Sequence, residues 1–459
     1  MPERFDAIVI GAGQAGPPLA GRLTQAGMTV ALVERHLVGG TCVNTGCMPT
    51  KTLVASARAA HVARHGADWG VTLPGPIAID MDRVKERAET VTRNARSGVE
   101  GWLGGMKGLS LVRGHARFES ARTVRVDDRL LEAERIFINV GGRATIPDMP
   151  GVHDVPVLTN TTMLALAELP RHLVVVGGSY IGLEFAQMYR RFGAEVTIVE
   201  KGSRLIGRED AEISDAIRAM LEREGVALRL NAECIRFARH GGGIAVGVNC
   251  TEGEPELVGS HVLLAVGRTP NTGDLGLDAA GVETDAKGYI RVDDHLRTSA
   301  PGIWALGDCN GRGAFTHTSY NDFEIVAANL LDGEDRKLSD RITAYALYVD
   351  PPLGRCGMGE EEAKKAGHRI LVGRRPMKRV GRATEMGETQ GFMKIVVDAE
   401  SRQILGGAVL GVSGDEAIHS ILDMMACKAP VDRLARTMHI HPTISELIPT
   451  IAGELQPLE

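Results

Sequence analysis

The feature that most constrains this chain is a strand that runs directly into a glycine turn and a helix near the N-terminus. Apolar residues Phe5–Ile10 predict a buried strand, and a G-A-G-Q-A-G turn at 11–16 follows it directly. A helical stretch continues through Leu23, and a second strand at 29–33 ends on Glu34. This strand–turn–helix–strand order, closed by an acid, is typical of a dinucleotide-binding unit.

The same arrangement occurs a second time in the middle of the chain. The strand Leu173–Val176 runs into a G-G-S-Y-I-G turn at 177–182, a helix continues to Phe192, and a strand at 195–199 ends on Glu200. The acid stands at the same spacing from the first glycine in both copies. One glycine motif of this kind is weak evidence, whereas two copies in the same context strongly favour two dinucleotide sites.

Each glycine of the first turn has a separate physical task. Gly11 permits the tight turn, Gly13 lets the backbone approach a pyrophosphate, and Gly16 allows the helix to pack closely on the strand. The N-terminus of the helix then offers free N–H groups and a partial positive charge to the phosphates.

The second turn departs from this pattern at its middle position, where Ser179 replaces glycine. Gly177 and Gly182 keep the other two places, and serine is a small side chain that still donates a hydrogen bond. We therefore expect a dinucleotide to bind with its phosphate slightly displaced. Two dinucleotides, one held and one exchanged, point to a flavin and a nicotinamide. Glu200 favours NADH, because an acid there binds the ribose diol and repels the 2′-phosphate of NADPH, although nearby basic residues soften that preference.

Redox chemistry is predicted in the segment Gly39–Lys51, immediately after the first unit. Four residues separate Cys42 from Cys47, and glycines around them relieve backbone crowding. A cysteine at a helix N-terminus has a lowered pKa because the helix dipole favours the thiolate. A zinc site explains the pair poorly, since no second Cys/His pair lies nearby. Two unrelated buried thiols would not explain the glycines.

A candidate acid–base pair lies near the C-terminus. His441 precedes a proline, and Glu446 follows five residues later. Imidazole titrates near neutral pH, and a carboxylate can orient it and raise its basicity. A histidine before proline is more often structural, so this pattern alone leaves both interpretations open. His439 has no assigned task and is predicted to be structural.

The rest of the chain suggests further parts of the fold. At ~150 residues per domain, 459 residues predict about three domains. Glycine turns after apolar strands, at Gly141 and Gly267, predict crossings between the two nucleotide units. Asp308 closes another strand, where a carboxylate can accept a hydrogen bond from a polyol. Beyond about residue 340, the alternating runs 392–397 and 404–410 predict antiparallel strands, with helical stretches after them at 415–428 and 431–438.

Composition excludes several classes of protein. A hydrophobic content of 44% argues against disorder, and a formal net charge of -6 suggests neither a nucleic-acid nor an anionic membrane partner. No apolar run approaches the ~20 residues of a membrane span. The N-terminus begins as a strand and not as a signal peptide, so a cytoplasmic location is expected. The seven scattered cysteines do not form a structural disulfide framework.

Together these motifs resemble the pyridine-nucleotide–disulfide oxidoreductases, the group of dihydrolipoamide dehydrogenase, glutathione reductase and mercuric reductase. The resemblance covers essentially the whole chain in the right order. Its most specific parts are the cysteine segment at 39–51 and His441-Pro442-Thr443 with Glu446. The resemblance implies an enzyme with tightly bound FAD, a pyridine nucleotide and an obligate homodimer.

The expected fold is α/β, with two Rossmann-like dinucleotide-binding domains and a C-terminal α+β dimerisation domain. The FAD-binding domain would begin at 1–145, and the NAD(P)-binding domain would occupy 146–265. The central part of the FAD-binding domain would follow at 266–338, and the dimerisation domain would occupy 339–459.

The resemblance also implies a role for each matching position. FAD would be bound by Gly11, Gly13, Gly16, Glu34, Gly40, Thr41, Lys51, Gly141 and Asp308. The pyridine nucleotide would be bound by Gly177, Ser179, Tyr180, Gly182, Glu200 and Gly267. Cys47 would lie against the flavin, Cys42 would attack the substrate, and Lys51 would pair with Glu184 near the flavin. Tyr180 would gate the nicotinamide pocket. His441, oriented by Glu446, would act as acid–base on the active site of the second subunit.

These roles imply that electrons pass from NAD(P)H through FAD and the Cys42–Cys47 pair to a small-molecule or protein-bound disulfide, reversibly and without a metal site. A metal-ion reductase of Cu(II) or Hg(II), or a quinone reductase, is an alternative. The stretch 315–318 and the prolines at 351–352 are similar to a mercuric-reductase-like branch that includes a copper-reducing enzyme. Residues 452–459 hold no vicinal cysteine pair of the mercuric reductase kind, so Hg(II) reduction is not favoured. A non-catalytic flavoprotein subunit is the remaining alternative, against which the cysteines and His441 argue.

Overall fold

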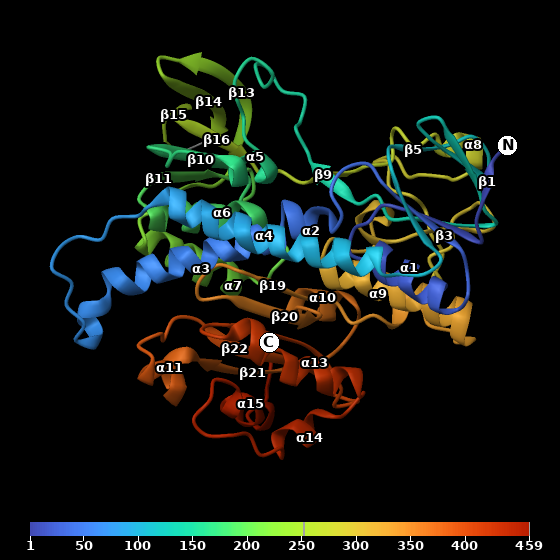
Figure 1. Cartoon of the computed structure of the whole chain (residues 1–459). Helices are drawn as coiled ribbons and strands as arrows, with labels where there is room; N and C mark the ends of the chain where they lie inside the picture. Colours follow the sequence, from blue (N-terminus) through green and yellow to red (C-terminus); the bar gives the residue numbers. More distant parts are fainter. Residues whose placement is uncertain (251–252, 459) are drawn as a thin grey trace.

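The first sheet is parallel and joins strands from distant parts of the chain. The computed structural model describes residues 1–250 and 253–458. In the sheet, the order is β18-β8-β2-β3-β4. The strands are β2 (Ala7–Ile10), β3 (Val30–Glu34), β4 (Leu109–Arg113), β8 (Arg135–Ile138) and β18 (Ile303–Ala305). The chain therefore leaves this sheet after β8 and returns to it about a third of its length later (Figure 1).

Both faces of this sheet are covered, which explains the unbroken apolar run of β2. Ala7 and Val9 pack on one side with helices α1 (Gly16–Gln25) and α9 (Thr316–Ala327). Ile8 and Ile10 pack on the other side. There they pack in one core with the side chains of a small sheet, whose strand order is β1-β7-β6-β5. Its strands are β1 (Glu3–Arg4), β5 (Ala116–Phe118), β6 (Thr123–Val126) and β7 (Arg129–Glu132). Alternate side chains of a strand point to opposite faces, so a strand buried on both sides is apolar throughout.

The second nucleotide unit repeats this construction. Its parallel sheet has the order β12-β11-β10-β16. The strands are β10 (His172–Val176), β11 (Glu195–Val199), β12 (Ala227–Arg229) and β16 (His261–Leu264). One face packs against α6 (Tyr180–Phe192) and α7 (Ala211–Arg223). The other face is covered by an antiparallel sheet of β13 (Ala232–His240), β14 (Gly243–Cys250) and β15 (Glu256–Gly259).

The chain crosses twice between the two nucleotide units, at the positions that the glycine turns of Gly141 and Gly267 predicted. Strand β9 (Gly142–Ala144) leads out of the first unit, and β17 (Arg268–Pro270) leads back. The two strands pair antiparallel, so the outgoing and returning chains form one two-stranded link. The segment boundaries at residues 145, 265 and 338 stay a prediction.

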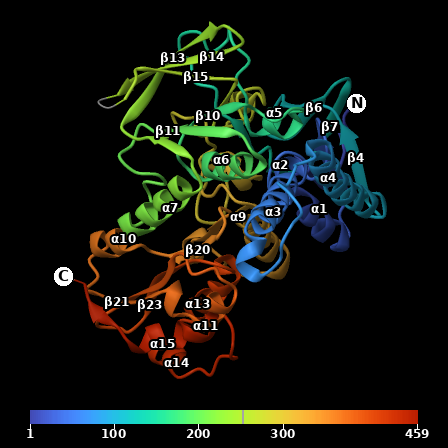
Figure 2. The same cartoon turned by 90° about the vertical axis from the view of Figure 1, so that its left-hand side faces the viewer.

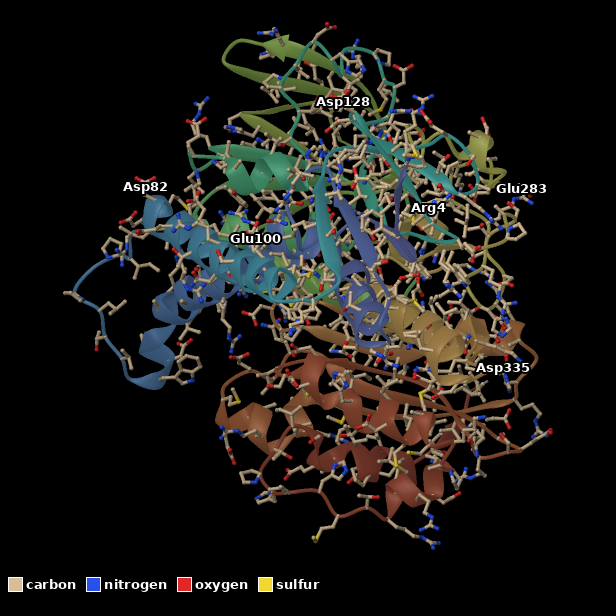
Figure 3. All side chains as sticks on the ribbon, turned by 45° about the vertical axis from the view of Figure 1, so that its right-hand side comes forward. Arg4, Asp82, Glu100, Asp128, Glu283 and Asp335 are labelled. Atoms are coloured by element: carbon tan, nitrogen blue, oxygen red, sulfur yellow. The ribbon has the colours of Figure 1, made fainter. Side chains whose placement is uncertain are left out.

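A pair of long helices projects from the first unit beside the second one. They are α3 (Cys47–Arg64) and α4 (Met81–Gly104), and a short helix α2 (Gly40–Asn44) precedes them. Asp80 caps α4 by accepting a hydrogen bond from the Arg83 amide at 3.0 Å. The outer face of α4 carries charged side chains such as Asp82 and Glu100, which are exposed (Figure 3). Within the described ranges, no helix combines the length and the apolar character that a membrane span needs.

The C-terminal part is an antiparallel sheet with helices packed on it (Figure 2). The strand order is β19-β20-β23-β22-β21-β24. The strands are β19 (Ala344–Leu347), β20 (Leu353–Gly357), β21 (Ile370–Pro376), β22 (Phe392–Asp398), β23 (Ile404–Leu410) and β24 (Gln456–Pro457). Its helices are α10 (Glu360–Lys365), α11 (Gly381–Glu385), α12 (Gly414–Ala417), α13 (His419–Ala426), α14 (Val431–Ala435) and α15 (Ile448–Gly453). The fold is therefore α/β with parallel sheets and a C-terminal antiparallel-sheet domain, as predicted.

One helix of this domain is shorter than the sequence predicts. The pattern predicts a helix over 431–438, but α14 ends at Ala435. Beyond it Arg436 forms a turn, and residues 437–440 have no regular secondary structure. The last turn closes with bonds to the third residue back, from the Arg436 amide to Arg433 and from the Thr437 amide to Leu434, and these end the α-helical ladder.

Candidate functional site

The first glycine turn is built so tightly that two of its glycines have no alternative. Gly11 has a φ of +105°, and a Cβ there would lie 2.3 Å from the carbonyl oxygen of Asn139. A Cβ on Gly16 would lie 2.1 Å from the carbonyl oxygen of Gly11. Gly13 is different, because its nearest neighbour would be the Asn139 side chain at 3.4 Å. The chain itself tolerates a side chain at Gly13, so glycine there leaves backbone open to the approach of a ligand.

The second turn repeats this geometry closely. Gly177 has a φ of +112°, and its Cβ would lie 2.4 Å from the carbonyl oxygen of Ala265. A Cβ on Gly182 would lie 2.1 Å from the carbonyl oxygen of Gly177. Ser179 precedes helix α6 in an extended conformation and makes no capping hydrogen bond. Gly267, at φ +132°, lies in the crossing after β16.

The two acids that close the units hold the turns in the same way. Glu34 accepts hydrogen bonds from the amides of Ala12 at 2.9 Å and His36 at 2.7 Å. Glu200 accepts them from the amides of Gly178 and Gly202, both at 2.7 Å. Each carboxylate oxygen keeps a second acceptor position for a ribose hydroxyl.

A cavity of about 1220 Å³ joins the first glycine turn to the cysteine segment and to the start of α6. Single small-molecule sites are commonly about 300–1,000 Å³, so this cavity has room for a large or composite ligand. The predicted site residues that line it are Gly11, Gly13, Glu34, Gly40, Thr41, Cys42, Cys47, Lys51, Gly141, Tyr180, Glu184 and Asp308. The predicted residues outside its lining are Gly16, Gly177, Ser179, Gly182, Glu200, Gly267, His441 and Glu446.

The cysteine pair lies on this cavity as two neighbouring thiols. Cys42 belongs to α2, and Cys47 is the first residue of α3, so its sulfur stands at a helix N-terminus. A hydrogen bond from Cys42 lowers the pKa of Cys47 to about 6, against the opposing effect of burial, and Thr316 and Lys51 act in the same direction as Cys42. The same bond and burial raise the pKa of Cys42. Of the two thiols, Cys47 therefore has the lower pKa.

Lys51 and Glu184 come from different nucleotide units and meet beside these sulfurs. The Lys51 Nζ atom donates to the two carboxylate oxygens of Glu184 at 2.7 and 3.0 Å. Glu184 is buried and also accepts a hydrogen bond from the Tyr348 amide at 3.0 Å. The Lys51 ammonium lies 4.7 Å above the centre of the Tyr348 ring. A cation is therefore held rigidly within electrostatic range of Cys47.

The residues along the cavity fit FAD. Gly13 and Gly40 face each other closely, since a Cβ on Gly40 would lie 2.8 Å from the Gly13 Cα atom, and this leaves bare backbone for a pyrophosphate. The free amides of α1 begin beside them. Asp308 lies further along the lining, where burial raises the pKa of its carboxyl group and Arg268 opposes that effect at 3.3 Å. A half-buried carboxylate of this kind suits a ribityl hydroxyl. The cysteine pair lies on the same cavity.

His441 and Glu446 pair with each other but not with the cysteines of their own chain. The His441 Nδ1 atom lies 2.7 Å from Glu446, and the histidine side chain is 80% exposed. Its neighbours Met438 and Ile440 are 94% and 78% exposed, which is unusual for large apolar side chains. His439 bonds the carbonyl oxygen of Ser445 at 2.7 Å, a contact that fits a structural role.

Sequence reasoning missed several residues that lie on this site. Thr316 Oγ1 is 3.3 Å from the Cys47 sulfur. Asn139 donates to the carbonyl oxygen of Gly11 at 3.2 Å and lies beside all three turn glycines. Tyr348 covers the Lys51–Glu184 pair. Only Thr316 carried a signal, as part of the 315–318 stretch that resembles the mercuric-reductase-like branch. In the part of the chain that the structure describes, no group of three or more His, Cys, Asp or Glu residues could hold a metal ion.

This fold and site define a class of α/β enzymes with two dinucleotide turns and a cysteine pair beside the first. Comparisons with known proteins agree. Residues 5–322 match the family model "Pyridine nucleotide-disulphide oxidoreductase", and 343–452 match the dimerisation domain of the same family. The chain belongs to the pyridine nucleotide-disulphide oxidoreductase family and is an oxidoreductase of the flavoprotein disulfide reductase type. Family membership implies FAD and a pyridine nucleotide, and the second match supports a homodimer.

Relatives with different names are similar over nearly the whole chain. The probable pyridine nucleotide-disulfide oxidoreductase RclA of Escherichia coli is 36% identical, over 97% of this chain and 98% of the relative. A dihydrolipoyl dehydrogenase of Thermus scotoductus is 35% identical, over 97% and 96%. A mercuric reductase of Streptomyces lividans is 32% identical, over 97% and 94%. A solved Cu(II) complex of the HOCl-induced flavoprotein disulfide reductase RclA from Escherichia coli has a TM-score of 0.88 at 35% identity, covering 98% of this chain and 99% of that chain.

Proposed function

We propose that this protein is a NAD(P)H-dependent disulfide reductase in which Cys42 and Cys47 relay an electron pair to an external disulfide. The observation that supports this most directly is the contact between the two thiols on the cavity, with Cys47 at the start of α3 and hydrogen-bonded by Cys42, which lowers the pKa of Cys47 to about 6 and raises that of Cys42. One thiol is then ready to donate electron density next to the cofactor, while the other stays available for exchange.

When bound, FAD supplies a two-electron carrier between the nicotinamide and the cysteine disulfide. The residues of the chain do the remaining work. Lys51, held by Glu184, stabilises negative charge beside Cys47. Cys42 attacks the substrate disulfide, forms a mixed disulfide and releases one thiolate. Cys47 then attacks the Cys42 sulfur, releases the second thiolate and restores the internal disulfide. The same steps run in reverse for a dithiol such as dihydrolipoamide.

Cys42 needs a base, because its raised pKa leaves it protonated at neutral pH. No imidazole among the described residues is hydrogen-bonded to it, whereas His441 is exposed on a face with two large apolar side chains. We infer that His441 of the partner subunit, oriented by Glu446, takes this proton and returns it to the leaving thiolate. Tyr180 lines the cavity at the start of α6. We infer that its ring gates the part of the cavity that admits the nicotinamide, which we call the nicotinamide channel.

Reduction of Cu(II) is the second candidate, because a relative that is 35% identical has been solved as a Cu(II) complex. Two thiols side by side are suitable ligands for Cu(I), the soft ion that this reduction produces. Hg(II) is less favoured.

An anaerobic titration of the FAD-loaded dimer with NADH and NADPH, followed by an acceptor panel, tests these proposals. The panel contains lipoamide, glutathione disulfide, Cu(II), Hg(II) and a quinone. Two electron equivalents should reduce the enzyme and produce long-wavelength absorbance, and NADH should be the better donor because of Glu200. An enzyme that neither nucleotide reduces would be a non-catalytic flavoprotein, and the proposal would be wrong.

A further inference from the structure

Glu209 is a buried carboxylate that the proposed mechanism does not use. Its side chain is 0% exposed, and it stands just before helix α7. Its Oε1 atom accepts hydrogen bonds from the hydroxyl groups of Tyr180 at 3.0 Å and Tyr345 at 2.5 Å. Its Oε2 atom accepts one from Arg355 Nε at 3.2 Å. A buried charge is tolerated when every partner is in place, so these four side chains have to be positioned as a unit.

The C-terminal domain fixes Glu209 firmly. Arg355 belongs to β20, is 5% exposed and also donates to the carbonyl oxygens of Cys356 at 2.6 Å and Gly407 at 3.2 Å. The next residue, Asp210, is bonded by the buried Lys394 of β22. The segment Glu209–Asp210 of the second nucleotide unit is thus bonded at two consecutive positions to one antiparallel sheet.

Tyr180 is held on its ring as well as at its hydroxyl. The ring meets Tyr345 edge-on at 5.6 Å and Phe315 edge-on at 6.2 Å. Tyr345 and Phe315 are themselves stacked at 5.4 Å, and Thr316 follows Phe315 and contacts Cys47. All these side chains line the cavity. Edge-on aromatic contacts are weak and adaptable, whereas a hydrogen bond to a buried carboxylate has one geometry. The hydroxyl is therefore the contact that resists displacement of the ring.

We propose that Glu209 is a positioning residue that holds Tyr180 closed over the nicotinamide channel, and that Tyr345 and Arg355 of the C-terminal domain hold Glu209 in turn. This inference rests on the proposed function, in which Tyr180 gates the channel. Access to the channel is then controlled by a domain that carries neither nucleotide turn. Each nicotinamide that enters has to break the Tyr180–Glu209 hydrogen bond. The smaller the fraction of enzyme in which this bond is open, the weaker is the apparent affinity for the nucleotide.

The test is the Tyr180→Phe variant of the FAD-loaded dimer, which keeps the ring and removes only the hydroxyl. We expect the Kd of the oxidised enzyme for NAD⁺, measured by calorimetry, to fall by about tenfold, because a hydrogen bond to a charged group no longer has to be broken. NADP⁺ replaces NAD⁺ as the probe if NADPH proves the better donor. Iodide should also quench the flavin fluorescence more strongly, since the ring no longer stays over the channel. Tighter binding after the loss of a contact is a result that a merely structural role does not give.

Two matched variants sharpen the result. Tyr189→Phe removes a buried hydroxyl on the same helix, 3.3 Å from the carbonyl oxygen of Met163, and should leave the Kd unchanged. Tyr345→Phe removes the other hydroxyl that donates to Glu209 Oε1. The hydrogen bond from Tyr180 is then kept without a competitor, so the Kd for NAD⁺ should stay the same or rise. Glu209→Gln should lower the Kd in the same direction as Tyr180→Phe, and its melting temperature shows whether the unpaired Arg355 destabilises the fold.

An unchanged or higher Kd in Tyr180→Phe, or an equal fall in Tyr189→Phe, overturns the positioning role. That outcome is distinct from failure of the proposed function. If neither NADH nor NADPH reduces the wild-type enzyme, the proposed function is wrong. If the wild type is reduced normally and Tyr180→Phe binds no more tightly, only the role of Glu209 is wrong.

Discussion

The two nucleotide units use almost the same backbone for different purposes. In each, a Cβ on the first glycine would lie 2.3 or 2.4 Å from a carbonyl oxygen, and a Cβ on the third would lie 2.1 Å from the carbonyl oxygen of the first. In each, the closing acid bonds an amide of the turn at 2.7 or 2.9 Å. The units differ at the middle position, which is Gly13 in one and Ser179 in the other.

The segments that extend beyond the two units are also different. The first unit continues directly into α2 and α3, which carry the cysteine pair, whereas the second continues into a segment bonded to the C-terminal sheet. The outer glycines are therefore required by the chain itself, whereas the chain does not crowd the Cβ position of Gly13. Chemistry is added outside the shared unit, in the segment that comes after it.

The largest expected effect is the loss of activity when the cysteine pair of the first unit is broken, while both nucleotide units stay intact. Cys47→Ser should lower disulfide reductase turnover by about 10³-fold or more, because the relay requires both sulfurs. FAD content and nucleotide binding should not change, since both turns remain intact. Steady-state assays with lipoamide and the absorbance spectrum of the two-electron-reduced enzyme measure this. Persistence of the long-wavelength band in the variant would show that Cys47 is not the thiolate beside the flavin.

Substitution of the third glycine in either turn should lower the stability by a similar amount but abolish a different function in each unit. Gly16→Ala and Gly182→Ala both place a methyl group 2.1 Å from a backbone oxygen, so each should lose about 3 kcal/mol or more of unfolding free energy. Gly16→Ala should lose FAD, whereas Gly182→Ala should keep FAD and lose reduction by NADH. Denaturant unfolding and flavin absorbance report both effects. Gly98→Ala is the control, since no atom lies within 4 Å of its Cβ position, and it should be neutral or stabilising.

A pH titration compares a thiol of each unit. In the reduced enzyme, the pKa of Cys47 is lowered to about 6, so the long-wavelength band should be present above pH 6 and fade as the pH falls through it. Because the native state binds fewer protons than the unfolded state between about pH 6 and the ordinary thiol pKa, stability of the reduced form should rise across that window. At higher pH the raised pKa of Cys42 acts in the opposite direction.

In the second unit, burial raises the pKa of Cys234 to about 11, and this thiol should stay protonated throughout the titration. The Cys234→Ala variant is therefore the control, and its titration midpoint should match that of the wild type. A shift in that variant would mean that the band does not report on Cys47.

The mildest change is expected at the middle residue of the second turn. Ser179→Gly should change the KM for the nucleotide only a few-fold and the stability by a few tenths of a kcal/mol, because serine and glycine are both accepted before a helix. The reciprocal Gly13→Ser should fold, since the nearest atom to its Cβ position is 3.4 Å away, but should bind FAD more weakly. If Gly13→Ser unfolds instead, the middle glycine serves the chain after all.

Local features were predictable to within a few residues, and distant contacts were not. Strands β11 and β23 begin and end where the apolar runs at 195–199 and 404–410 placed them. Helix α14 is shorter than its pattern predicts, because the amides after it bond three residues back and end the α-helical ladder. Lys51 and Glu184 are separated by 133 positions, and only a family resemblance suggested their pairing. Glu209, Tyr345 and Arg355 gave no pattern at all, since no periodicity connects residues from two domains.

Residue type and spacing alone were enough to specify the two glycine turns, the acids that close them and the cysteine at the start of a helix. These features depend on near neighbours along the chain, whose sterics and hydrogen bonds are local. Only the packing of the domains decided which of the two thiols has the lower pKa, which carboxylate bonds Lys51 and which residue bonds the Tyr180 hydroxyl. Those outcomes depend on burial and on charges that meet after the domains pack, and electrostatic energies follow distance in space and not distance in sequence.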